Sequence, residues 1–411
     1  MDKLRLLYVM PRLPYPPRKG DQAVPYQRLR LLGQIHEITL LAFVEDKKQI
    51  AGVEMLQPFC REIHAVLLPR WRSLAGVAWR GLWSQVPLQV LYYHSPEFAA
   101  LLKRLVEETR FDLVHGFMLR IAPYLMKIPA VKILELIDSM TLNLQRRIAL
   151  EGVPMRWILN EELRRVASYE KRTTEAFDHC IVVSDADRAL LSMDSVSVIP
   201  LGVDAQEFAP AVSPQAHSRV IFSGNMGYSP NVHAVDWFVK QCWPEIRRQV
   251  PDAHFVIAGG NPGRSVRRLE RVAGVEVTGD VPSMAAALRQ ASLAVAPMLS
   301  GSGMQFKILE AMASGLPVVT TSLGRGNIQA EVGREILVAD EPMEFTRAVL
   351  ALLCNPEKRH AIGASARLFI SRTHGWELAA KRVDDIYRSI LYKSKSSAPA
   401  RPDALCEAAK A

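Results

Sequence analysis

The 411-residue sequence lacks the features that mark several large classes of protein. Its five cysteines are scattered, with neither a Cys-x-x-Cys pair nor zinc spacing, so we expect free thiols in a reducing cytoplasm rather than a disulfide framework. No apolar run reaches the roughly 18 residues of a membrane span, and no signal peptide is evident. A P-loop and a Gly-x-Gly-x-x-Gly turn after a strand are also missing, which excludes the commonest nucleotide-binding fingerprints.

What the chain does have is a net charge of +9, with 49% hydrophobic and 23% charged residues. Such a charge favours a nucleic acid, an anionic membrane surface or an anionic substrate as partner. Because no recognised nucleic-acid motif occurs, we expect no nucleic acid and favour the other two. The length is too great for one ordinary core and predicts two or three domains.

Short apolar segments alternate with amphipathic ones along the chain, which predicts an α/β fold with doubly wound parallel sheets. The strands expected in the first half are 4–10, 37–44, 61–68, 112–116, 131–137 and 179–184, with helices at 21–34, 96–110 and 157–177. Those expected in the second half are 220–223, 254–259, 275–278, 293–297, 317–321 and 336–338, with helices at 231–249, 343–353, 356–373 and 377–392.

The alternation breaks near residue 209, where two prolines stand in a stretch without periodicity. We therefore predict a first domain over 1–208, a linker over 209–218 and a second domain over 219–375. A final helix over 376–392 is expected to pack back towards the first domain, and 393–411 reads as a disordered tail. Ligands of such sheets bind at the carboxyl ends of the strands, so the site is expected between the domains.

The segment 300–321 carries the strongest sign of chemistry. Small residues at 300–303 open into a helix with Lys307 and Glu310, and Gly315 and Pro317 end that helix before a buried strand. Exposed N–H groups of a first helical turn attract anions, a lysine adds a full charge, and a carboxylate can hold hydroxyl groups. This combination favours a nucleotide-sugar site, although a solvated helix at an ordinary turn would look similar.

On further motifs the chain resembles the family 4 glycosyltransferases, which have the two-domain GT-B architecture, and among them the sugar transferases of bacterial exopolysaccharide systems. The segments that carry the resemblance, which covers most of the chain, are 11–21, 112–115, 198–204 with Phe208, 222–231, 275–281 and above all 300–321. It implies a first domain on the acceptor side and a second domain that binds the nucleotide sugar.

The resemblance also implies roles on the donor side. Glu310 matches the second Glu of the Glu-x7-Glu motif, which holds the ribose hydroxyls, whereas Ser302 stands where the first Glu is expected. The family often has an Arg and a Lys for the diphosphate where this chain has Asn225 and Asn231. Some cation must support the departing diphosphate. We predict Lys307, the N–H groups of Gly303 and Met304, and Arg325 as a second candidate, with Asn225 donating hydrogen bonds.

On the acceptor side the resemblance places His115 beside the donor sugar, where a neutral imidazole can hydrogen-bond a hydroxyl or the leaving phosphate. Gly20 allows a close approach of its loop to the donor phosphate. Asp21 and Asp138 are acceptor-side candidates, and each can equally cap the helix that follows it. Residues 69–83 interleave tryptophans with arginines, which suits either an anionic membrane interface or a helix that faces the core.

The resemblance implies a metal-independent, retaining hexosyltransferase without a cofactor. Its expected donor is a UDP- or GDP-linked sugar, its acceptor is a saccharide, preferentially lipid-linked, and its role lies in exopolysaccharide biosynthesis. We expect a cytoplasmic protein in peripheral contact with the inner face of the plasma membrane. Two alternatives stay open: a non-catalytic GT-B protein of a polysaccharide assembly complex, and a sugar-nucleotide epimerase.

Overall fold

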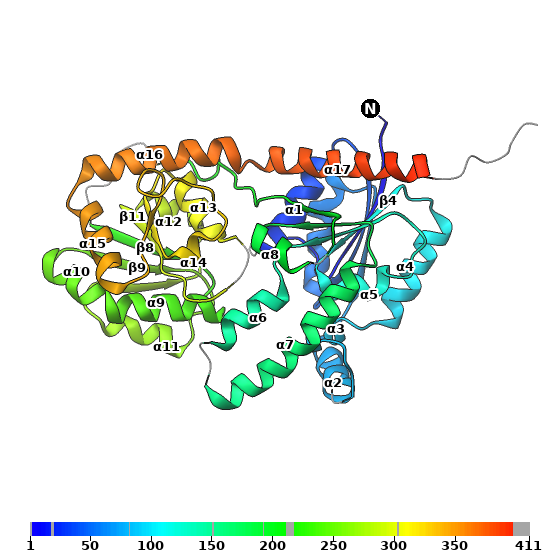
Figure 1. Cartoon of the computed structure of the whole chain (residues 1–411), viewed down its shortest axis with the longest axis horizontal. Helices are drawn as coiled ribbons and strands as arrows, with labels where there is room; N and C mark the ends of the chain where they lie inside the picture. The colour runs from blue at the N-terminus through cyan, green and yellow to red at the C-terminus, as the bar shows by residue number, and fades with distance from the viewer. Residues whose placement is uncertain are drawn as a thin grey trace, which may run out of the picture.

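The computed structural model describes residues 2–17, 20–81, 83–149, 152–191, 193–210, 218–301 and 304–397. Its described strands form two sheets whose pairings are parallel. The strand order is β3-β2-β1-β4-β5-β6-β7 in the first sheet and β10-β9-β8-β11-β12-β13 in the second. Each sheet has helices on its faces, and the two lie side by side in Figure 1. The predicted α/β fold with two doubly wound parallel-sheet domains is confirmed.

The first sheet is built from short runs rich in Leu, Ile and Val, which suit strands buried on both faces. Its strands are β1 (Arg5–Met10), β2 (Glu37–Val44), β3 (Glu62–Leu67), β4 (Leu113–Phe117), β5 (Lys132–Leu136), β6 (His179–Val182) and β7 (Val196–Val198). The register places Tyr8 of β1 between Leu40 of β2 and His115 of β4. As a result, the middle of β4 lies in the centre of the sheet.

The helices of the first domain fill the crossovers between these strands. They are α1 (Gly20–Leu32), η1 (Lys47–Phe59), α2 (Arg70–Arg80), α3 (Leu88–Tyr92), α4 (Pro96–Glu108), η2 (Leu119–Ile121), α5 (Ala122–Leu125), α6 (Met140–Ile148), α7 (Val153–Thr174) and α8 (Asp185–Leu190). Two of them matter for the site. The helix α6 follows β5 towards the second domain, and α2 projects from the lower edge in Figure 1.

The second domain repeats the plan with six strands. These are β8 (Arg219–Ser223), β9 (His254–Ala258), β10 (Val275–Gly279), β11 (Leu293–Ala296), β12 (Val318–Thr320) and β13 (Leu337–Val338). Its helices are α9 (Ser229–Gln241), α10 (Trp243–Gln249), α11 (Arg264–Arg267), η3 (Arg268–Arg271), α12 (Met284–Arg289), α13 (Phe306–Ala313), α14 (Ser322–Arg325), α15 (Pro342–Leu353) and α16 (Pro356–Thr373). The single helix expected over 231–249 is divided at Cys242 into α9 and α10.

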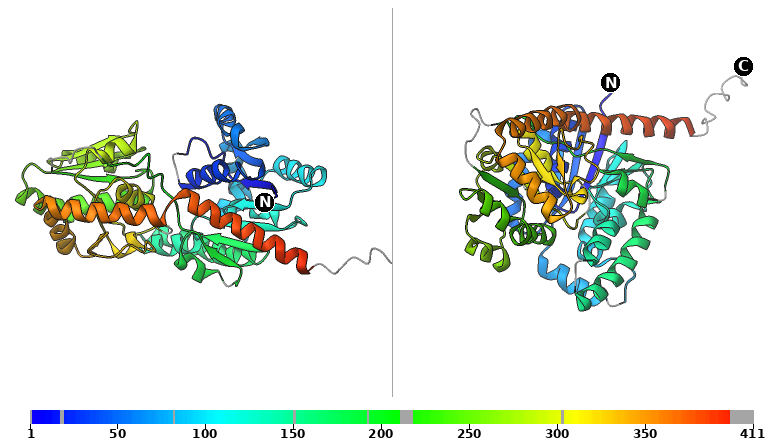
Figure 2. Two further views of the ribbon diagram at one scale, coloured as in Figure 1. Left: turned by 90° about the horizontal axis from the view of Figure 1, so that it is seen from above. Right: turned by 60° about the vertical axis from the view of Figure 1, so that its left-hand side comes forward.

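The chain returns to the first domain through its last helix, α17 (Trp376–Ser397). Figures 1 and 2 show α16 along the second domain and α17 along the first. The hydroxyl of Tyr387 in α17 lies 2.7 Å from that of Tyr8 in β1, in the core of the first domain. The helix extends five residues beyond the expected end at 392, and 398–411 lies outside the described residues, as does most of the expected linker.

Candidate functional site

Both sheets reverse their strand order at one point, between β1 and β4 and between β8 and β11. In sheets of this kind ligands bind beyond the carboxyl ends of the strands at that point. In the second domain the strand β8 is followed by Gly224, whose φ of +154° favours glycine. A Cβ atom there would lie 2.7 Å from Asn231 Nδ2 and 3.3 Å from Lys307 Cε. The end of β8 therefore meets the start of α13 without room for a side chain.

Lys307 and Glu310 lie one turn apart on α13 and are both part-buried. Burial lowers the pKa of Lys307 to about 8, although the carboxylate of Glu310 opposes this change. Burial likewise raises the pKa of Glu310 to about 7, with Lys307 opposing. Within the described part of the chain Lys307 forms no ion pair, and its Nζ donates to Gln305 Oε1 at 2.8 Å. The charged groups of Lys307 and Glu310 are thus partly removed from water, and each only partly offsets the effect of burial on the other.

The first turn of α13 is open towards the same place. Its N-cap residue, Gln305, makes no side-chain hydrogen bond to the turn, and the N–H of Ile308 donates to the Gln305 carbonyl oxygen at 3.0 Å. Among the described residues the N–H groups of Phe306 and Lys307 have no acceptor, so they can bind an anion. Met304 is buried just before it. Ser302 and Gly303, predicted as donor contacts, lie outside the described residues.

Asn225 and Asn231, which stand where the resembled family often has an Arg and a Lys, stabilise the loop after β8 through hydrogen bonds. Asn231 Nδ2 donates to the carbonyl oxygen of Asn225 at 2.9 Å, while the buried Asn231 Oδ1 has no hydrogen-bond partner among the described residues. Asn225 Oδ1 accepts from the N–H of Gly227 at 2.9 Å and from Asn261 Nδ2 at 3.3 Å. The oxygen of Asn225 is engaged in this way, and the role of its amide N–H groups at a phosphate stays a prediction.

Arg325 lies in α14, beyond β12, and its Nη2 donates to the carbonyl oxygen of Ala330 at 3.0 Å. Its Nε is buried without a partner. In this position the guanidinium braces the loop that follows α14. The role of Arg325 at a diphosphate stays a prediction.

Two contacts join the first domain to the region at the start of α13. A Cβ atom on Gly20 would lie 3.0 Å from the ring of Phe306, so the first residue of α1 packs against the start of α13. On α6, Arg146 Nη1 donates to the carbonyl oxygen of Gly301 at 2.7 Å. The sequence analysis did not identify Arg146, because an arginine in the last turn of a helix is usual at the surface.

Asp138 follows β5 on this same side. Its carboxylate accepts from Asn143 Nδ2 at 3.2 Å, and Asn143 also reaches the hydroxyl of Tyr228 in the second domain at 3.4 Å. Burial, and then the charge of Asp138, raises the pKa of Tyr228. The N-cap of α6 is Ser139, which accepts from the N–H of Leu142, so the capping interpretation of Asp138 is wrong.

His115 requires a correction. It lies in the middle of β4, is completely buried, and its Nδ1 is hydrogen-bonded to the hydroxyl of Tyr387. Its Nε2 lies 3.2 Å from Glu135 Oε2, and Glu135 Oε1 accepts from Arg28 Nη2 at 3.0 Å. The expectation that His115 contacts the donor sugar is therefore wrong, because β4 continues to Phe117 and the chain emerges at Met118.

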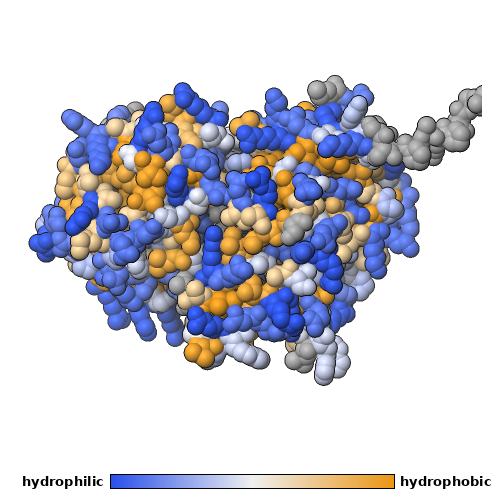
Figure 3. Space-filling model, viewed as in Figure 1, coloured by the Kyte–Doolittle hydropathy of each residue, from blue (hydrophilic) through white to orange (hydrophobic). Residues whose placement is uncertain are grey.

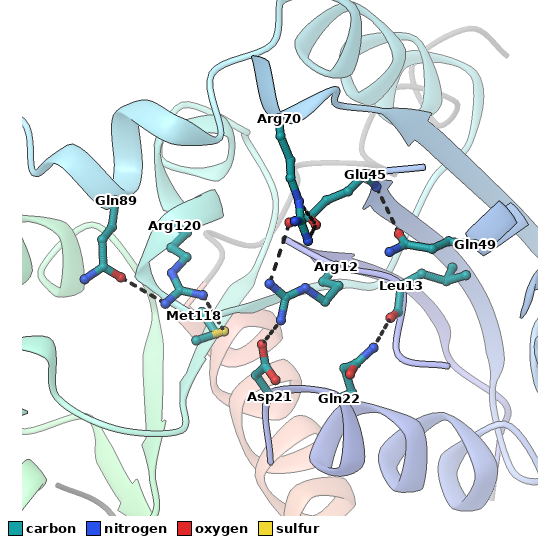
Figure 4. A network of polar contacts seen from close by, with 10 residues as sticks. All are labelled: Arg12, Leu13, Asp21, Gln22, Glu45, Gln49, Arg70, Gln89, Met118 and Arg120. Atoms are coloured by element: carbon teal, nitrogen blue, oxygen red, sulfur yellow. Dashed lines mark hydrogen bonds and ion pairs between the residues drawn. The ribbon is translucent and has the colours of Figure 1, made fainter. Parts of the chain in front are cut away.

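Beyond β1, β2 and β4 lies a polar cluster that sequence reasoning also missed (Figure 4). Arg12 pairs with Asp21 at 2.5 Å, which gives the acceptor-side candidate Asp21 a partner. Arg70 at the start of α2 donates from Nε to Glu45 at 2.8 Å. Arg120 follows Met118, a non-glycine residue with φ of +66°, and backbone of that kind often marks a functional site. Polar groups thus lie between α2 and the end of β4.

The helix α2 shows that the core-facing interpretation of residues 69–83 is wrong. Only Ser73 of α2 is buried, whereas Trp71, Leu74 and Trp79 are exposed, as is Trp83 beyond it. The start of α7 exposes a second set, Val153, Met155, Trp157 and Ile158. Both elements lie at the lower edge of the molecule in Figure 1 and in the right-hand view of Figure 2, and an apolar group projects from that edge in Figure 3.

One pair of carboxylates has a spacing that can hold a divalent cation, Asp185-Ala186-Asp187. Asp185 pairs with Arg188 at 2.9 Å, and the buried Asp187 accepts from the N–H of Ser139 at 3.0 Å. These partners occupy both carboxylates. The described ranges contain no cluster of three or more His, Cys, Asp or Glu side chains suited to a metal, and no helix within them is long and apolar enough to cross a membrane.

Comparisons with known proteins agree with this architecture. Residues 217–355 match a family model described as "Glycosyl transferases group 1". HepE of Anabaena, solved in complex with UDP, superimposes with a TM-score of 0.66 at 13% identity, over 94% of this chain and 100% of that one. At that identity the likeness shows the fold, which is GT-B.

Two relatives were found by sequence. A protein of Klebsiella pneumoniae, described as an uncharacterized 44.6 kDa protein in the cps region, is 20% identical over 90% of this chain and 96% of its own length. A GDP-mannose-dependent alpha-(1-6)-phosphatidylinositol monomannoside mannosyltransferase of Mycobacterium tuberculosis is 28% identical over 47% of this chain and 56% of its own. These matches confirm the predicted resemblance to GT-B glycosyltransferases and support a sugar-transferring protein.

Proposed function

We propose that this chain, which has the GT-B fold and a second domain that matches the group 1 glycosyltransferases, is a retaining hexosyltransferase. It moves a sugar from a nucleoside diphosphate to a lipid-linked saccharide. The observation that carries the proposal is the part-buried pair of Lys307 and Glu310 at the open first turn of α13. A cation and N–H groups can take a diphosphate, and a carboxylate one turn later can take the ribose hydroxyls. The cps-region relative supports a role in exopolysaccharide biosynthesis.

The chemistry that we propose is support of the leaving group. As the bond from the anomeric carbon to the diphosphate oxygen breaks, negative charge grows on that oxygen, and Lys307 stabilises it from a fixed position. The acceptor hydroxyl attacks from the face that the diphosphate leaves, so no protein nucleophile is needed. Positioning of the two substrates supplies the rest of the rate enhancement. No metal is invoked in this scheme.

A lipid-linked acceptor is supported by the surface of the first domain. Exposed tryptophans on α2 lie among Arg70, Arg72 and Arg80, and α2 has no acidic residue. The exposed start of α7 lies at the same edge. Indole rings with basic neighbours suit an anionic bilayer interface, and the polar cluster around Arg12 and Arg120 lies between α2 and the cleft side of the sheet. We propose peripheral contact with the membrane at this edge.

The test is transfer of a labelled sugar. The protein is incubated with UDP-, GDP- and ADP-linked sugars and a lipid extract that contains lipid-linked saccharides, with and without EDTA. We expect label in the lipid fraction from one donor family, retained in EDTA, with an α-linkage from an α-linked donor. Label lost in EDTA would contradict metal independence, and an inverted linkage would contradict retention.

A second candidate is a non-catalytic GT-B protein, which the uncharged Asn225 and Asn231 favour. It predicts saturable donor binding, or none, without transfer or hydrolysis with any acceptor. Sedimentation with anionic phosphatidylglycerol vesicles is a separate measurement. Trp79→Ala and Trp157→Ala should each weaken it, whereas equal sedimentation of both variants would remove the membrane contact from the account.

A further inference from the structure

The helix α6 of the first domain extends across to the donor loop of the second. Besides the bond from Arg146 to the carbonyl oxygen of Gly301 at 2.7 Å, Asn143 Nδ2 reaches the hydroxyl of Tyr228 at 3.4 Å. Gly301 lies in the turn between β11 and α13 and has a φ of +109°. A Cβ atom on Gly301 would be 3.8 Å from that same hydroxyl of Tyr228. The two bonds therefore converge on the region around Gly301 and Tyr228.

The charge balance at this point is incomplete. A diphosphate brings about two negative charges, whereas the loop after β8 presents Asn225 and Asn231. The guanidinium of Arg325 is turned to the carbonyl oxygen of Ala330. Lys307 is the cation that the second domain places at the open turn, and burial lowers its pKa to about 8. A further positive charge within reach would balance the ligand.

Arg146 and Lys307 reach the same turn from opposite domains. Lys307 Nζ donates to Gln305 Oε1 at 2.8 Å, and Gln305 Nε2 lies 3.8 Å from the Cβ position of Gly301. Arg146 holds the carbonyl oxygen of that same glycine. Gln305 and Gly301 thus lie between the side chains of Lys307 and Arg146, at the start of α13.

We propose that Arg146 is a diphosphate-binding residue supplied by the facing domain, which exchanges the Gly301 carbonyl for a phosphate oxygen when the donor binds. This inference rests on the proposed function, since it names a ligand of the same site. A guanidinium matches a phosphate better than a carbonyl, because it can donate two parallel charge-assisted hydrogen bonds. Binding of the donor then links the two domains through its diphosphate, and a ligand that lacks a diphosphate does not link them.

The test compares a nucleoside, its monophosphate and its diphosphate by calorimetric titration, with the base that wild type prefers. Arg146→Gln keeps an N–H donor for the Gly301 carbonyl but removes the charge. We expect diphosphate affinity to fall roughly 10- to 100-fold in this variant, nucleoside affinity to stay unchanged, and Arg146→Lys to recover part of the loss. Arg164→Ala, an exposed arginine of α7 paired with Glu161, is the matched control and should bind as wild type.

Three outcomes overturn the inference. Equal diphosphate affinity in Arg146→Gln and wild type would leave Arg146 as a brace of the Gly301 turn. An equal loss for nucleoside and diphosphate would do the same, as would a loss that Arg146→Lys does not reduce. Failure of wild type to bind any nucleoside diphosphate is a different result, since it overturns the proposed function itself.

Discussion

Each domain contains a buried carboxylate beside a cation, and the two clusters have opposite character. In the first domain, burial alone would raise the pKa of Glu135, but Arg28 and His115 lower it to about 2. In the second, burial raises the pKa of Glu310 to about 7, and Lys307 only partly opposes this. In the first cluster the charges of Arg28 and Glu135 pair with each other, and the cluster holds the fold. The second keeps charge that a ligand can satisfy, which is the mark of a binding site.

The cluster of Arg28, His115 and Glu135, which we call the closed cluster, also shows why the first domain binds the last helix. Tyr387 of α17 joins Tyr8 and His115, and all three side chains are completely buried. Burial lowers the pKa of His115, so the imidazole is neutral at pH 7. A neutral histidine can accept from the Tyr387 hydroxyl through Nδ1 and donate from Nε2 towards Glu135. The residues form a structural connection between the ends of the chain.

The largest effect is expected from opening the closed cluster. Glu135→Gln leaves the Arg28 guanidinium buried without a counter-charge, which costs about 3–5 kcal/mol of unfolding free energy. Urea unfolding measures this loss, and donor affinity of the folded protein should not change. Because the folded pKa of Glu135 is depressed, its contribution is complete above the unfolded value of about 4.3 and declines as pH falls towards about 2.

The matched change in the open cluster, which is the pair of Lys307 and Glu310, should lower activity rather than stability. Lys307→Met removes the cation from the site where leaving-group charge develops, so kcat/KM for transfer should fall about 10²- to 10³-fold. The free energy of unfolding should stay the same or rise, since a charge disfavoured by burial is removed. A large loss of stability without a loss of transfer would reverse the comparison between the two clusters.

A smaller effect is expected where α17 joins the closed cluster. Tyr387→Phe removes the hydroxyl that bonds Tyr8 and His115, and it leaves buried polar atoms unpaired at a cost of about 1–3 kcal/mol. Tyr8→Phe breaks one of the two bonds and should cost less. Thermal unfolding of both variants ranks them, and equal stability of Tyr387→Phe and wild type would show that apolar packing alone holds the helix.

The smallest effect is a pH dependence of the open cluster. Donor binding needs ionised Glu310 and protonated Lys307, so the association constant should be greatest between pH of about 7 and 8 and fall outside it. The decline should approach tenfold per pH unit on each side. In Glu310→Gln the acid-side decline near pH 7 should disappear. An unchanged profile would separate Glu310 from the site.

The sequence was sufficient for the sheets, because strands such as β2 and β9 are apolar runs between turns and depend little on distant partners. It also placed Lys307 and Glu310 on one helix, because their spacing is local, and their role at a donor stays a prediction. It failed for His115, because the role of that residue depends on Tyr387, which lies 272 positions away. It missed Arg146 for the same reason, since only the folded chain brings α6 to Gly301.

The most direct measurement is calorimetric titration of wild type and Lys307→Met with UDP, GDP and ADP, in the absence of metal. The account predicts saturable binding of one of the three by wild type and a loss of about 100-fold or more in Lys307→Met, with both proteins equally stable. Wild-type protein that binds none of the three, or a Lys307→Met variant that binds as tightly as wild type, would contradict the claim that the open cluster is a nucleoside diphosphate site.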